Sequence, residues 1–120
     1  MNVNYKKIAE AQETFKKLSS VEMDILDAIA LKEGILELDE YYGYIDKYKE
    51  KLLHQYASKL PNGEWEFKEE NSEKNFIQSY EKYLEIETKL TNFPVTIRKS
   101  DRIKLSAIDM IRISDLIHFI

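Results

Sequence analysis

The sequence has 120 residues, a net charge of −4 at neutral pH and no cysteine. This length predicts a single domain over residues 1–120, and the lack of cysteine excludes disulfides, thiol nucleophiles and thiolate metal sites. The acidic total disfavours a general nucleic-acid binder, because neutralising phosphates requires clustered lysine and arginine. No segment has the apolar run of a secretory signal or a membrane span, so we expect a cytoplasmic protein without membrane partners.

The chain begins with a predicted amphipathic helix over residues 3–18. Its apolar side chains recur at spacings of three and four, which places them on one face: Ile8, Ala11, Phe15 and Leu18. Ser19 and Glu22 have the spacing of a capping box, which predicts that the next helix begins there.

A long central helix is predicted over residues 21–57. One apolar stripe runs along it at alternating spacings of three and four: Ala28, Leu31, Ile35, Leu38, Tyr42, Ile45, Leu52 and Tyr56. The stripe keeps its phase across Gly34 and Gly43, so we expect a continuous helix that bends at most at these two positions. Such a stripe is typical of a coiled coil between chains, which would make a homo-oligomer, or of packing against the helices of the same chain.

Four further elements follow the long helix. Alternating acidic and aromatic residues predict an extended arm over residues 64–67, and helical spacing predicts a helix over residues 72–90. A β-hairpin is predicted over residues 95–105, followed by a terminal segment over residues 106–120, in which Ser114 caps a last turn. Because this segment is apolar, we expect it to be docked on the rest of the chain. Together these elements predict a mainly α fold: a long central helix in an antiparallel hairpin or three-helix arrangement, with a small C-terminal β-hairpin.

The sequence has no recognisable catalytic, metal-binding or cofactor-binding motif. The only two histidines, His54 and His118, lack a second ligand at a helical spacing. No glycine-rich phosphate loop or nucleophile elbow occurs, and adjacent carboxylates do not face each other on a helix. We therefore predict a protein that is not an enzyme and that has no catalytic residues, no metal and no cofactor.

An acidic, tyrosine-rich segment of the long helix is the strongest candidate contact surface. Consecutive positions on a helix differ by 100°, so its tyrosines cannot all enter one core. Tyrosine offers a large contact area at a small cost in side-chain entropy, which suits a protein interface. The predicted partner-binding residues are Asp39, Glu40, Tyr41, Tyr44 and Tyr48. Ordinary packing within the chain and mimicry of nucleic acid are the alternatives.

A weaker candidate is a small basic patch on the outer side of the predicted hairpin. It comprises Arg98, Lys99, Arg102 and Lys104. Contact with nucleic acid through this patch is an alternative to its being an ordinary solvated surface.

The order of several short motifs resembles a small, uncharacterised family of phage and prophage proteins of Gram-positive bacteria. These motifs are Lys51 to Tyr56, Gly63 to Phe67, Ile103 to Ser106 and Arg112 to Leu116, and the resemblance extends from about Leu18 to the end of the chain. Genes of this family often lie near tail and lysis genes. The resemblance therefore implies a protein that acts in the bacterial host cytoplasm or in the virion.

Two functions follow from the helical stripe and this resemblance. The first is a phage structural or assembly protein, associated with the tail, that binds other protein subunits. The second is a small inhibitor of a host enzyme or defence system, similar to an anti-CRISPR protein, that acts through the acidic tyrosine-rich face. Neither function predicts catalytic residues in this chain.

Overall fold

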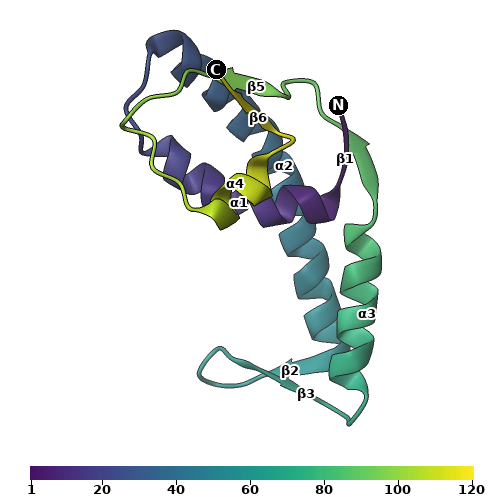
Figure 1. Cartoon of the computed structure of the whole chain (residues 1–120). Helices are drawn as coiled ribbons and strands as arrows, with labels where there is room; N and C mark the ends of the chain where they lie inside the picture. The colour runs from purple at the N-terminus through teal and green to yellow at the C-terminus, as the bar shows by residue number, and fades with distance from the viewer.

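The structure is a computed structural model that describes all 120 residues, and it is mainly helical (Figure 1). The helices are α1 (Tyr5–Ser19), α2 (Ile25–Tyr56), α3 (Ser72–Leu84) and α4 (Ala107–Ile113). The strands are β1 (Asn2–Asn4), β2 (Ala57–Lys59), β3 (Trp65–Phe67), β4 (Glu87–Lys89), β5 (Val95–Ile97) and β6 (Ile117–Phe119). The prediction of a mainly α fold is thus confirmed.

Helix α2 runs unbroken for 32 residues through both of its glycines. It begins later than predicted, because the side chain of Asp24 accepts the backbone N–H of Leu26 and caps the helix. The predicted capping box is wrong. Ser19 is the last residue of α1, and the side chain of Glu22 forms an ion pair with Arg102.

The two predicted helices that flank α2 are shorter than expected, because their outer ends form strands. Strand β1 pairs antiparallel with β4, and Val3 lies opposite Thr88 in this ladder. Asn4 then caps α1 by accepting the backbone N–H of Lys7. The predicted helices over residues 3–18 and 72–90 are therefore wrong at these ends.

The predicted hairpin over residues 95–105 is also wrong. Its first half is strand β5, which pairs in parallel with β6 at the end of the chain, so that Val95 lies opposite Ile117. Its second half, residues 102–105, forms no strand and leads into α4. Both Val95 and Ile97 are buried. The parallel ladder with β6 supplies the interstrand backbone hydrogen bonds that a hairpin partner would otherwise supply.

The terminal segment contains a complete capping box that the prediction missed. Ser106 accepts the backbone N–H of Asp109, and Asp109 accepts the backbone N–H of Ser106 in return. Ser114, the predicted cap, instead follows the last residue of α4. The predicted arm over residues 64–67 is extended, as strand β3, and pairs antiparallel with β2.

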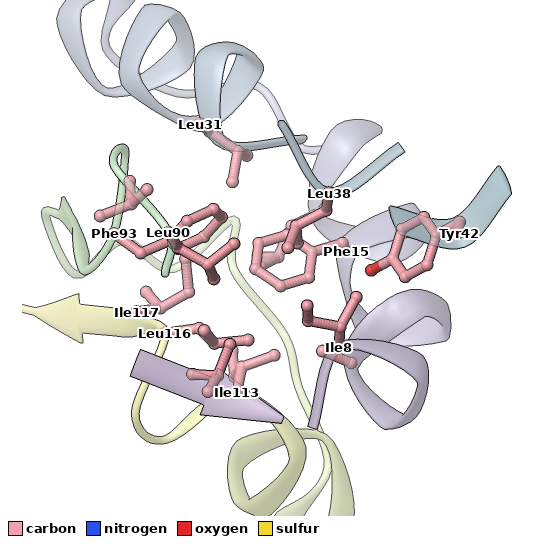
Figure 2. Close-up of a cluster of buried hydrophobic side chains, with 14 of the residues drawn as sticks. Ile8, Phe15, Leu31, Leu38, Tyr42, Leu90, Phe93, Ile113, Leu116 and Ile117 are labelled. Carbon is pink, nitrogen blue, oxygen red and sulfur yellow. The ribbon is translucent and has the colours of Figure 1, made fainter. Parts of the chain in front are cut away.

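The main core lies where α1, α4 and the strands β5 and β6 pack against α2 between Leu31 and Ile45 (Figure 2). Sixteen buried hydrophobic residues form it, including Leu31, Leu38, Tyr42 and Ile45 of α2. These four residues, which we call the inner face of α2, belong to the predicted coiled-coil stripe. Most of that stripe is therefore occupied by residues of the same chain.

Gly34 lies beside this inner face and allows a close approach. A Cβ atom at this position would come within 2.8 Å of Phe93 Cζ, which is shorter than ordinary van der Waals contact. The segment before β5 thus packs directly against the backbone of α2. The second half of α2 packs against α3 and ends in the β2–β3 ribbon (Figure 1).

Candidate protein-binding surface

Five tyrosines from three helices meet where α1 begins and α3 passes α2. We call them the tyrosine cluster: Tyr5, Tyr41, Tyr44, Tyr48 and Tyr83. The ring centroids of Tyr48 and Tyr83 are 3.9 Å apart in a stacked arrangement, and Tyr5 lies 5.4 Å from Tyr83 and 5.8 Å from Tyr41. Tyr41 and Tyr44 are in edge-on contact at 6.0 Å. Such contacts stabilise the junction between the helices.

The three predicted contact tyrosines have different environments within this cluster. Tyr41 and Tyr48 are half-buried, and the Tyr41 hydroxyl accepts a hydrogen bond of 2.9 Å from Thr88. Tyr44 is the exposed member, with 45% of its surface accessible. Its hydroxyl donates a 2.7 Å hydrogen bond to Glu40 Oε1, and this bond and the negative charge of Glu40 raise the pKa of Tyr44. Tyr44 is therefore the most exposed of the three predicted contact tyrosines.

The acidic residues around Tyr44 do not all face solvent. Asp39 and Glu40 are exposed. Glu37 instead accepts backbone N–H groups from Thr91 and Asn92 at 2.8 and 2.9 Å. Partial burial acts to raise the pKa of Glu37, but these hydrogen bonds outweigh it and lower the pKa. The free negative charge beside Tyr44 thus comes from Asp39 and Glu40.

A second candidate surface, which the sequence interpretation missed, is the side of α2 opposite the core. Its apolar side chains in the first three turns are exposed: 72% for Ile25, 47% for Ile29 and 59% for Leu36. We call this side, from Ile25 through Gly43 to Lys51, the outward face of α2. The spacings of four and seven residues between these apolar side chains indicate a second apolar side of the helix. The longer inner stripe overlaps this pattern in the sequence, so it was not recognised.

Helix α4 also exposes apolar side chains, although the terminal segment was expected to be docked. Ile113 and Leu116 are buried as expected, whereas Ile108, Met110 and Ile111 face solvent. Contiguous exposed apolar side chains of this kind mark interaction surfaces more often than scattered ones do.

The predicted basic patch is interrupted by carboxylates. Arg102 pairs with Glu22 at 3.0 Å, and the backbone N–H of Arg98 donates to Asp27. Both arginines line a shallow depression together with Asp24. This mixture of charges does not form the continuous positive surface that binds phosphates.

The pKa of one carboxylate, that of Asp109, is strongly shifted, and its hydrogen-bond partners explain the shift. Lys17 Nζ donates to it at 2.9 Å and Thr14 Oγ1 at 3.0 Å, and the Ser106 N–H adds a third bond. Lys17 and the Ser106 N–H hold the pKa of Asp109 far below its usual range. The buried side chain thus joins α4 to α1.

The remaining observations assign no chemistry to the chain. No group of three or more histidine, aspartate or glutamate side chains is arranged to hold a metal ion. None of the helices has both the length and the apolar character of a membrane span. No family model, curated protein or solved structure matches this chain. The resemblance to phage proteins therefore stays a prediction.

Proposed function

We propose that this protein acts by binding another protein and that Tyr44 and Glu40 form the centre of the contact. The observation that carries this proposal is the exposure of Tyr44 on top of a packed tyrosine cluster. The edge-on contact with Tyr41 and the hydrogen bond to Glu40 restrain the Tyr44 ring, so a partner gains contact area at a reduced entropic cost of ordering the side chain. Asp39 and Glu40 favour a partner with a basic surface.

The biological setting that we propose follows from the resemblance to phage proteins. In this setting the chain is a structural or assembly protein of a phage particle, associated with the tail, which binds other subunits in the host cytoplasm or in the virion. The exposed apolar side chains of α4 support such a role, because Ile108 and Ile111 offer an additional contact that assembly would cover.

A second candidate function is inhibition of a host enzyme or defence complex. The pairing of Tyr44 with Glu40 favours it specifically, since a compact acidic and aromatic surface competes well for a basic groove. The two functions differ in their partner. An assembly protein binds a phage subunit, whereas an inhibitor binds a host protein.

The test is an affinity purification from infected cells, followed by measurement of the purified pair by calorimetry. We expect Tyr44→Ala to weaken binding at least tenfold, as expected for a central interface tyrosine. We also expect the affinity to fall as salt is raised, because the acidic side chains are exposed. Tyr41→Ala is a poorer probe, since Tyr41 also contacts Tyr5 and Thr88.

Ile77→Ala is the matched control. Ile77 lies on α3 and is 44% exposed, almost the same fraction as Tyr44, but it is not part of the tyrosine cluster. We expect this variant to bind as the wild type does. Full binding by Tyr44→Ala, or equal losses in the two variants, would contradict the proposed contact.

A further inference from the structure

A hollow lies between α4, β6 and the segment that precedes α4. Its volume is about 290 Å³, which is sufficient for one bulky apolar side chain. Four of its six lining residues are hydrophobic: Ile103, Leu105, Met110 and Phe119. We call this hollow the α4 pocket. Apolar walls favour an apolar occupant, because water inside such a pocket forgoes hydrogen bonds that it makes in bulk solvent.

Two contacts hold the segment that forms one wall of the α4 pocket. The backbone N–H of Lys99 donates to Ile120 O at 2.8 Å and joins the start of this segment to the strand pair β5–β6. Further along, Arg102 Nη1 pairs with Glu22 Oε2 at 3.0 Å, which joins the segment to the connection between α1 and α2. The pocket therefore forms without a partner, and binding to it costs less entropy than binding to a disordered segment.

Exposed side chains of α4 extend this apolar surface beyond the pocket. One side of α4 is docked on α1 (Figure 1), where Asp109 and Ile113 are buried. Met110 lines the pocket and is partly exposed, and Ile111 beside it is exposed. Ile108 is also exposed and lies one turn before Ile111. A partner can thus fill the pocket with one side chain and cover the free side of α4 with others.

The unpaired charges of this surface are mainly positive. Two carboxylates of residues 99–115 are paired with lysines of α1: Asp109 with Lys17 at 2.9 Å and Asp115 with Lys7 at 3.1 Å. Three basic side chains of the same segment form no ion pair within the chain: Lys99, Lys104 and Arg112. Asp101 is the one carboxylate there without an ion pair. The surface therefore complements a negatively charged partner.

Lys99 places one of these charges at the α4 pocket itself. It is the only charged residue that lines the pocket. The pocket differs in this respect from the depression lined by Arg98, Arg102 and Asp24, where both signs of charge are present. A carboxylate next to the apolar side chain of a partner would meet the Lys99 ammonium group, and such a pair selects the partner by its charge.

We infer that the α4 pocket and the free side of α4 form the docking site of an acidic amphipathic segment from another protein. One bulky apolar side chain of that segment enters the pocket, and a neighbouring carboxylate pairs with Lys99. The hollow favours a protein over an anionic membrane, because a membrane surface has no single side chain that fills a pocket. The inference gives a partner chemistry to the additional contact proposed for α4, and it does not depend on the contact at Tyr44.

The first test is fluorescence polarisation with two labelled peptides of about 14 residues, or four helical turns. Both contain leucine and one tryptophan at spacings of three and four, and the remaining positions are glutamate in one peptide and lysine in the other. We expect the acidic peptide to bind at least roughly tenfold more tightly, and more weakly as salt is raised. Equal binding of the two peptides, or no binding of the acidic one at roughly 0.1 mM protein, would overturn the inference.

Lys99→Glu and Ile111→Glu locate the binding of the acidic peptide. Both side chains are exposed, so both variants should keep the circular dichroism spectrum and the Tm of the wild type. Each should weaken binding at least roughly tenfold. Lys74→Glu, on the exposed surface of α3, changes the charge by the same amount and should bind as the wild type does. Equal losses in Lys74→Glu and Lys99→Glu would contradict the site. Tyr44→Ala should bind the peptide fully, so failure of either proposed contact leaves the other unaffected.

Two further measurements test the other occupants of this surface. Co-sedimentation with vesicles of equal parts phosphatidylglycerol and phosphatidylcholine tests an anionic membrane, and sedimentation equilibrium of the chain alone tests a second copy. We expect no vesicle binding and no dimer that Ile111→Glu abolishes. Vesicle binding that Lys99→Glu abolishes would show that lipid covers this surface, and a dimer sensitive to Ile111→Glu would show that a second copy does. Either result would overturn the inference.

Discussion

The inner and outward faces of α2 have similar residue types but different surroundings. Leucine, glycine and tyrosine each occur on both: Leu38, Gly34 and Tyr42 lie on the inner side, and Leu36, Gly43 and Tyr44 lie on the outward side or at its edge. The inner residues contact α1 and the segments near β5, whereas the outward ones are exposed. Residue type alone therefore does not determine which side of this helix is the core.

This difference explains why α2 is apolar on two sides over its first three turns. A helix that faces one core needs a single apolar stripe, with polar residues opposite. The inner stripe already supplies the apolar side chains of α2 that the core requires. The exposed Ile25, Ile29 and Leu36 are therefore available for a contact outside the chain. Three pairs of substitutions, one member on each side, test this division.

The largest difference is expected between the two leucines. Leu38 is fully buried, so Leu38→Ala should lower the free energy of unfolding by about 2–5 kcal/mol through lost burial and the cavity left behind. Leu36→Ala should change it by less than about 0.5 kcal/mol, because Leu36 is exposed. Urea denaturation followed by circular dichroism gives both values. Similar losses would show that the outward side is also needed for folding.

The two glycines should respond in opposite directions. Gly34→Ala forces Phe93 Cζ and Val95 Cγ2 to move from 2.8 and 3.2 Å, an overpacking cost of about 1–3 kcal/mol. This cost exceeds the gain in helix propensity, so the variant should be destabilised by about 1 kcal/mol. Gly43→Ala should stabilise the fold by up to about 1 kcal/mol, because a Cβ atom there meets nothing within 4 Å. Thermal unfolding of both variants checks the signs, and destabilisation by Gly43→Ala would mean that the glycine has a role within the single chain.

Much of the inner face was predictable from the sequence, because an amphipathic helix repeats its signal over many turns. Leu31, Leu38, Tyr42 and Ile45 were identified from their spacing alone. The strands were harder, because each has three residues and gives too short an alternation to specify a partner. The pairing of β5 with β6 joins Val95 to Ile117 across the whole of α4, and no local pattern encodes it.

The candidate contact surface was predictable in part for a related reason. Helical geometry required that some tyrosines of residues 41–48 lie outside the core, and Tyr44 does. Tyr41 contacts Tyr5, and Tyr48 contacts Tyr83. These contacts depend on how α1 and α3 pack against α2, and the sequence of α2 alone does not specify that packing. The outward face was missed because its shorter apolar pattern overlaps the inner one.

The smallest difference is expected between the two tyrosines. The Tyr42 hydroxyl is buried without a hydrogen-bond partner from the chain, so Tyr42→Phe should stabilise the fold by about 1 kcal/mol or less at neutral pH. Tyr44→Phe loses one exposed hydrogen bond to Glu40 and should change stability by a few tenths of a kcal/mol. Thermal unfolding at neutral pH measures both effects, and a clear loss of stability in Tyr42→Phe would reveal a partner for its hydroxyl.

Alkaline pH separates the same two tyrosines further. Burial, assisted by the charge of Asp39, raises the pKa of Tyr42 in the folded chain. The fold therefore favours the neutral phenol, and the resulting stability is complete below the unfolded pKa of about 10 and is lost as the pH rises through the raised folded value. Tyr42→Phe should lose less stability than the wild type between about pH 8 and pH 11. The stability of Tyr44→Phe should follow that of the wild type more closely over this pH range, because an exposed phenol ionises in both the folded and the unfolded chain. A smaller loss of stability in Tyr44→Phe than in Tyr42→Phe would contradict the assignment of Tyr42 as the buried tyrosine.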